Sequence, residues 1–203
     1  YFLNHVRGST RCRQAAQRLG GAIGTLAQIG LMAVSVDNQS PRVIGLELVP
    51  ADVAWGAAVG AGIVTVLFVA ELALGWLRII GYGEVVVPRE SLAINLLWDA
   101  LFHIGVSVHE EASMRGWLLV NTAQALAAYL GADSVALSMS LSVALQASLF
   151  ALLHVGSPGA TRVGLLNLWV GGTCAALNVL LSGGLSFGLG WHFGWNLFMG
   201  HLL

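Results

Sequence analysis

Residues 163–191 read VGLLNLWVGGTCAALNVLLSGGLSFGLGW and contain no charged side chain. A helix needs roughly 20 predominantly apolar residues to cross the hydrocarbon core of a bilayer. This run is too long for one crossing, and Gly183 and Gly184, near its C-terminal third, predict a break between two helices. The stretch therefore indicates a helical chain whose main solvent is lipid.

Further apolar runs of similar length occur elsewhere in the chain. Those without any charge are residues 19–36, 53–70, 116–132 and 134–153. Another stretch, 91–108, is interrupted by Asp99 and His103 and is still predicted to be a helix. None of these runs alternates polar and apolar residues as the strands of a membrane barrel do. We predict an all-α, polytopic transmembrane bundle; the runs allow five to seven spans, and dividing the longest run favours about six to seven.

The composition supports the same interpretation. Hydrophobic residues make up 57% of the chain and charged residues 9%, with mean hydropathy +0.79, whereas about a quarter of a soluble domain is charged. The net charge is -1 and all nine positive residues are Arg, so we predict no nucleic-acid partner. Four of them precede the first apolar run: Arg7, Arg11, Arg13 and Arg18. The positive-inside rule predicts that residues 1–18 form a cytoplasmic arm.

The connections between the apolar runs are short, which predicts a single transmembrane domain over residues 1–203. The two polar connectors are 37–52 and 78–90, and no extramembrane domain fits between the runs. Function is therefore expected inside the bilayer or at its surface. Cys12 and Cys174 form no spacing pattern and are predicted to be unpaired. The arm lacks a signal-peptide cleavage pattern, so the first span is predicted to be retained.

Glycine pairs at four-residue spacing suit close contacts between membrane helices, because small residues let two backbones approach. Such pairs occur at Gly20 and Gly24, Gly56 and Gly60, and Gly190 and Gly194. With 26 glycines in the chain, the same spacing also arises by chance.

Ionisable side chains inside the runs are candidates for function, because each costs on the order of 3 kcal/mol on insertion scales. Asp99, His103 and Glu110 follow one another at spacings of four and seven, which places them on one helix face. Glu111 and Arg115 are four residues apart, a spacing that predicts a neutralising ion pair.

Later helices carry polar groups at the same spacing. Phe150 and His154 share one helix face, and so do His192 and Asn196. A single intramembrane His is more often a packing or interfacial residue than a functional one. Three helices that each contribute such a group favour a common functional site.

Three motifs follow one another on successive apolar helices: E-E-x-x-x-R-G at 110–116, F-x-x-x-H at 150–154 and H-x-x-x-N at 192–196. In this order they resemble the CAAX prenyl protease and bacteriocin-processing (CPBP) family of intramembrane endopeptidases, also called the Abi family. The resemblance covers residues 92–203, the motif-bearing core, and the earlier residues match only as generic spans. Met114 departs from the pattern, since an aromatic residue is common before the Arg.

The resemblance implies a site and a reaction. The first Glu of the pair and the His of the second motif act on the attacking water, which carries over to Glu110 and His154. The last His and Asn stabilise the oxyanion, which carries over to His192 and Asn196. A carboxylate that reaches a water can serve as its general base, and an imidazole or amide N–H is a suitable oxyanion donor. Three further residues are expected to hold these four groups in place: Glu111, Arg115 and Phe150.

Metal dependence stays open at this point. Two His and a Glu can form a zinc site, and the resembled family has been described as metalloprotease-like, so zinc would bind His154, His192 and Glu110. His109 and Glu110 begin like H-E-x-x-H, but Ser113 replaces the second His, so the zincin pair is absent. We favour a metal-free site.

Residues 184–188 match G-x-S-x-G, but a nucleophile elbow needs a strand-to-helix turn, which is not expected here. A rhomboid-like serine site at Ser186 is a better alternative, although Phe187 stands where a Gly would follow the Ser.

Two other function classes remain. The fold could serve a catalytically silent membrane partner, such as an immunity or assembly factor, or a proton or solute pathway lined by Asp99, His103 and Glu110. The intact set of catalytic candidates favours the enzyme, and the lack of an inverted repeat disfavours the pathway.

For the enzyme we expect a membrane-associated peptide or protein substrate in a lipid bilayer, of prokaryotic plasma-membrane type, without selecting the substrate. The side on which the site opens depends on whether residues 116–130 span the bilayer or lie in its interface. The polar residues Asn121, Thr122 and Gln124 favour the interface.

Overall fold

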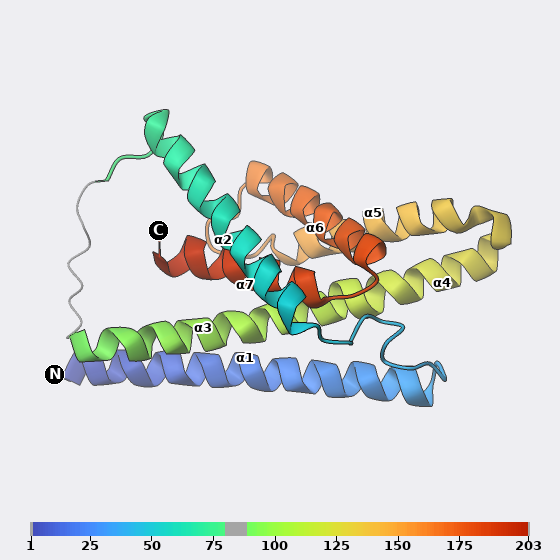
Figure 1. Cartoon of the computed structure of the whole chain (residues 1–203), viewed down its shortest axis with the longest axis horizontal. Coiled ribbons are helices and arrows are strands. Elements are labelled where there is room, and N and C mark those ends of the chain that lie inside the picture. Colours follow the sequence, from blue (N-terminus) through green and yellow to red (C-terminus); the bar gives the residue numbers. More distant parts are fainter. Residues whose placement is uncertain (1, 80–88, 203) are drawn as a thin grey trace. The chain divides into compact units, whose positions relative to one another are not determined.

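The computed structural model describes residues 2–79 and 89–202 (Figure 1). Regular structure in these residues is helical throughout, without a strand. The α-helices are α1 (Phe2–Ser35), α2 (Pro50–Ala73), α3 (Arg89–Glu111), α4 (Leu119–Leu130), α5 (Val135–Leu153), α6 (Arg162–Ser182) and α7 (Ser186–Leu197). The prediction of an all-α chain is confirmed. The predicted connector at 78–90 lies largely outside the described residues.

Three helices in the described part of the chain are long and apolar enough to cross a membrane: α2, α5 and α6. The protein is thus a helical integral membrane protein. Helix α1 begins at Phe2, so the arginine-bearing arm and the first apolar run form one continuous helix. The arm contains Arg, Gln and Ala, which are all good helix formers, and nothing in it breaks the helix.

The longest apolar run is divided as predicted. Helix α6 ends at Ser182, and Gly183 follows with a φ of 72°, a left-handed conformation that glycine adopts without strain. The Gly183 N–H donates to the carbonyl of Val179 and so closes the last turn. Helix α7 then begins at Ser186.

Two compact units make up the described chain. The first contains Tyr1–Thr25, Pro50–His109 and Leu189–Leu203, and the second contains Leu26–Val49 and Glu110–Gly188. The division falls inside α1, α3 and α7.

In the first unit, glycines let α7 lie directly against α2. A side chain at Gly190 or Gly194 would overlap the backbone of α2, and one at Gly60 would overlap the backbone of α7. Close contact is therefore confirmed for these three glycines. Gly20 and Gly24 have nothing within 4 Å, so the suggestion that this pair mediates a helix contact is wrong.

In the second unit, α4 and α5 run antiparallel and are joined by a short turn, with α6 beside α5 (Figure 1). Gly131 ends α4 with a φ of 93°, and the 3₁₀ turn Ala132–Ser134 leads into α5. The C-terminal part of α1 and the connector after it pack on this unit through the buried side chains Ile29, Ala33, Ile44 and Ala112. This unit carries most of the predicted site residues.

Candidate active site

The first motif lies where the helical pitch changes. Helix α3 ends at Glu111, and Ala112–Leu118 continues as a π-helix before α4 begins. π-Helical turns are rare and occur frequently at functional sites, because the wider turn shifts the side chains around it. Glu110 is the last residue but one of α3 and is partly exposed.

The predicted ion pair between Glu111 and Arg115 is present. Nη1 of Arg115 donates to Oε1 of Glu111 at 3.2 Å, and each side chain is only 2% exposed. Two opposite charges buried at this depth depend on each other, because removing either would leave the other unpaired in a medium of low dielectric.

Phe150 extends this charge pair toward α5. The guanidinium carbon of Arg115 lies 4.2 Å from the centroid of the Phe150 ring, a cation–π contact between buried groups. Gly172 on α6 provides room, since the position of a Cβ there is 3.5 Å from Cδ1 of Phe150. The aromatic residue of the second motif therefore binds the arginine of the first.

His154 directly follows α5 and is oriented by the same Phe150. Its Nδ1 lies 2.8 Å from the Phe150 carbonyl oxygen, and the two rings are 4.8 Å apart between centroids. A carbonyl oxygen only accepts, so Nδ1 must carry the hydrogen. In the neutral imidazole Nε2 is then the basic nitrogen, available to water, substrate or a metal.

His192 and Asn196 lie one turn apart on α7, in the part of that helix that belongs to the first unit. Both are partly buried. The neighbouring Trp191 and Trp195 contact each other edge to face, with centroids 6.4 Å apart. The glycines that hold α7 against α2 thus also position the third motif.

The structure brings five of the predicted site residues together in one unit: Glu110, Glu111, Arg115, Phe150 and His154. The remaining two, His192 and Asn196, share one helix face in the other unit. That all four catalytic candidates line one cavity remains a prediction.

The possible zinc ligands are divided in the same way, with Glu110 and His154 in one unit and His192 in the other. Within either unit, the described residues contain no group of three His, Cys, Asp or Glu side chains suited to a metal. His154 by itself fits a metal ligand, because its Nε2 is the free ring nitrogen.

Ser186 has a structural role that the sequence did not reveal. Its hydroxyl accepts from the Val49 N–H at 2.9 Å and donates to the Glu47 carbonyl at 3.1 Å, and the residue is 4% exposed. A hydroxyl used in both directions and hidden from solvent is poorly suited to nucleophilic attack. The rhomboid-like alternative loses its support.

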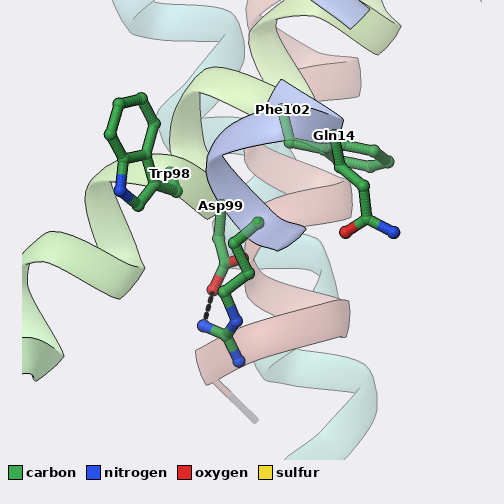
Figure 2. Close-up of a pocket in the computed structure, with 5 residues that line it drawn as sticks. Gln14, Trp98, Asp99 and Phe102 are labelled. Carbon is green, nitrogen blue, oxygen red and sulfur yellow. Dashed lines mark hydrogen bonds and ion pairs between the residues drawn. The ribbon is translucent and has the colours of Figure 1, made fainter. Parts of the chain in front are cut away.

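Asp99 belongs to a separate feature at the contact between α1 and α3. Figure 2 shows it paired with Arg11, whose Nη1 lies 2.8 Å from Oδ2 of Asp99. The pair borders a hollow of about 200 Å³ lined by Arg11, Gln14, Trp98, Asp99 and Phe102. None of the catalytic candidates lines this hollow. The disfavoured pathway alternative had Asp99 lining a polar route; in the structure its ion pair with Arg11 joins α3 to α1.

The fold and these contacts define a helical membrane protein with a buried polar site where its first two motifs, 110–116 and 150–154, meet. A family model described as type II CAAX prenyl endopeptidase Rce1-like matches residues 92–198, more than half of the chain. The chain belongs to this family of membrane proteases. Among curated proteins and among solved structures, no match was found.

Proposed function

We propose that the protein is an intramembrane endopeptidase that hydrolyses a membrane-associated peptide or protein with a glutamate-activated water. The observation that carries the proposal is the linked set Glu111, Arg115, Phe150 and His154, which holds a basic His154 Nε2 in the unit that also contains Glu110. Family membership supports the reaction class.

The reaction assigns one task to each polar group. Glu110 takes a proton from water, and the resulting hydroxide attacks the carbonyl carbon of the substrate while His154 Nε2 accepts a hydrogen bond from that water. His192 and Asn196 donate to the oxyanion that forms. The proton held by Glu110 then passes to the leaving amine, so one water is consumed for each bond cleaved.

Glu110→Gln tests the assignment of the base. The variant keeps the size and hydrogen bonding of the side chain but cannot take a proton, so cleavage in membranes should stop while the protein stays at normal abundance. Asn196→Ala should retain residual activity, because loss of one of two oxyanion donors costs roughly a hundred- to a thousandfold. The measurement is cleavage rate per folded protein. Normal cleavage by Glu110→Gln would show that Glu110 is not the base.

Zinc is the second variable of the mechanism. We propose a metal-free reaction, so a strong chelator should leave the cleavage rate of purified protein unchanged. If a chelator abolishes cleavage and added zinc restores it, His154 and His192 act as ligands, and the metal supplies the polarisation assigned above to side chains.

We further propose that the single domain crosses a plasma membrane of prokaryotic type about six to seven times, with its arginine-rich N-terminal helix end in the cytoplasm. The apolar character of α2, α5 and α6 and the four Arg residues before the first apolar run support this topology. Labelling of Cys12 by an impermeant thiol reagent from the outer side of intact cells would contradict it.

A further inference from the structure

Gln146 is a buried polar residue that belongs to none of the three motifs. It lies on α5 one turn before Phe150 and is 0% exposed. Neither the nitrogen nor the oxygen of its side-chain amide has a hydrogen-bond partner among the described residues. Burying an amide in this way is strongly unfavourable, because the bonds it makes in water are lost and not replaced. The position therefore indicates a ligand that the amide binds.

Two further buried atoms in the same unit also lack a hydrogen-bond partner among the described residues. The Nε of Arg115, a residue 1% exposed, and the Oδ1 of Asn178 on α6 find no partner in the described chain. Together with Gln146 these groups present both donors, at Arg115 and Gln146, and acceptors, at Gln146 and Asn178.

These atoms surround the polar site already described. The amide nitrogen of Gln146 and Cδ1 of Phe150 each lie 3.5 Å from the point where a Gly172 side chain would begin. Arg115 lies over the Phe150 ring, and His154 contacts that ring as well. The Phe150 ring thus lies between Gln146 and His154, whose Nε2 is assigned to the reaction.

Gly188 leaves space beside Asn178. A Cβ built at Gly188 would lie 3.4 Å from Oε2 of Glu111 and 3.8 Å from Oδ1 of Asn178. These are ordinary contact distances, so about one methyl group fits between two oxygen atoms. A small donor molecule at this place would reach Oδ1 of Asn178, which has no partner among the described residues.

We propose that Gln146, Arg115 and Asn178 hold internal water molecules. These molecules supply the water that is consumed in hydrolysis at Glu110 and His154. Water fits because it both donates and accepts; an anion would meet the amide oxygens, and a cation would meet the guanidinium. The assignment of these waters to hydrolysis rests on the proposed function. Each cleavage transfers a hydroxyl from water to the carbonyl carbon and a hydrogen to the leaving amine.

A polar stripe of small hydroxyl residues on α5 leads up to Gln146. Ser138 and Ser142 lie at four-residue spacing before Gln146 and are 1% and 0% exposed. Each donates to the backbone carbonyl four residues earlier. Each hydroxyl oxygen keeps acceptor capacity. The stripe leads from the turn between α4 and α5 toward Phe150.

Radiolytic labelling tests the proposal without a substrate. A short X-ray pulse makes hydroxyl radicals from water where that water lies. Phe150 is only 7% exposed, so radicals formed from internal water beside it should oxidise it. The experiment uses the full-length protein in lipid nanodiscs. Oxidation of Phe150 should fall several-fold in Gln146→Leu, which is close in size to Gln and removes the polar atoms of the side chain.

Gly188→Ala provides an independent variant, since the added methyl group fills the space between Glu111 and Asn178. It should also lower the labelling of Phe150. Gly171→Ala is the matched control, because it makes the same change within α6 at a position with nothing within 4 Å. Its labelling should equal that of the parent.

Thermal stability gives a second readout. If Gln146 were dry, Gln146→Leu would remove an unsatisfied amide and raise the Tm; with bound water the Tm should not rise. A raised Tm, or Phe150 labelling that is absent or unchanged in both variants, would overturn the water site. Where cleavage is measurable, both variants should lose about ten- to a hundredfold, as when outer partners of a site are removed.

The two proposals fail separately. Labelling as expected together with normal cleavage by Glu110→Gln would leave the water site standing and refute the glutamate mechanism. Absence of Phe150 labelling, together with loss of cleavage in Glu110→Gln, would refute the water site and leave the glutamate mechanism standing.

Discussion

At the scale of single residues, Phe150 connects two motifs that lie far apart in the sequence. Its ring binds the Arg115 guanidinium, and its carbonyl oxygen accepts from Nδ1 of His154. Arg115 in turn neutralises Glu111, next to the proposed base Glu110. The position of the guanidinium in one motif and the orientation of the imidazole in the other therefore depend on the same aromatic residue.

Arg115→Met tests this dependence. The substitution leaves Glu111 charged, buried and without its cation, so it should lower the free energy of unfolding by roughly 3–5 kcal/mol. The double variant Arg115→Met with Glu111→Leu should lose clearly less, because neither charge remains. Denaturant unfolding in detergent micelles measures both. Equal losses in the single and double variants would show that the pair is not coupled.

At the scale of helices, local sequence explains where elements begin and end. Gly183 ends α6 in the left-handed conformation, and the π-helix Ala112–Leu118 interrupts the passage from α3 to α4. Glycine also determines how closely α7 approaches α2. This contact supports the helix that carries His192 and Asn196.

Gly190→Ala should disturb the contact between α7 and α2. Its methyl group would overlap the backbone of α2, which cannot move as a side chain can, so the expected loss is about 1–3 kcal/mol of unfolding free energy. Gly62→Ala on α2 has nothing within 4 Å and should be neutral or stabilise by up to about 1 kcal/mol. The measurement is the Tm of each variant. Equal Tm values for Gly190→Ala and Gly62→Ala would contradict close packing at Gly190.

At the scale of the whole molecule, the proposed mechanism assigns four polar groups, carried by two units, to one substrate carbonyl. The second unit contains Glu110 and His154, and the first contains His192 and Asn196. Facing lipid singly, these groups would be strongly unfavourable, and for this reason the sequence predicts that they line one polar cavity.

Cysteine cross-linking tests this convergence. In a chain without Cys12 and Cys174, cysteines replacing His154 and Asn196 should react readily with a short bismaleimide, because groups acting on one carbonyl lie within a few ångströms of it. Leu145→Cys paired with Asn196→Cys is the control, since Leu145 lies on the opposite face of α5 from His154 and is exposed. Faster cross-linking of the control pair would refute a shared cavity.

Features that depend on spacing along one helix were predictable from the sequence alone. The Glu111 to Arg115 ion pair follows from helical geometry, in which residues four apart lie on one face. The break after α6 follows from local sequence as well, because glycine adopts the left-handed conformation seen at Gly183. A Gln one turn before Phe150 in an apolar helix was a signal of the same kind, and sequence reasoning missed it.

Contacts between distant segments were decided by the tertiary structure. Asp99 meets Arg11 across 88 positions, and Ser186 holds the backbone of Val49 across 137. No periodicity relates such residues, because their meeting depends on how whole helices pack and which glycines let them approach. Sequence therefore determined which groups share a helix face, whereas packing determined which of them are buried as structural contacts and which remain for chemistry.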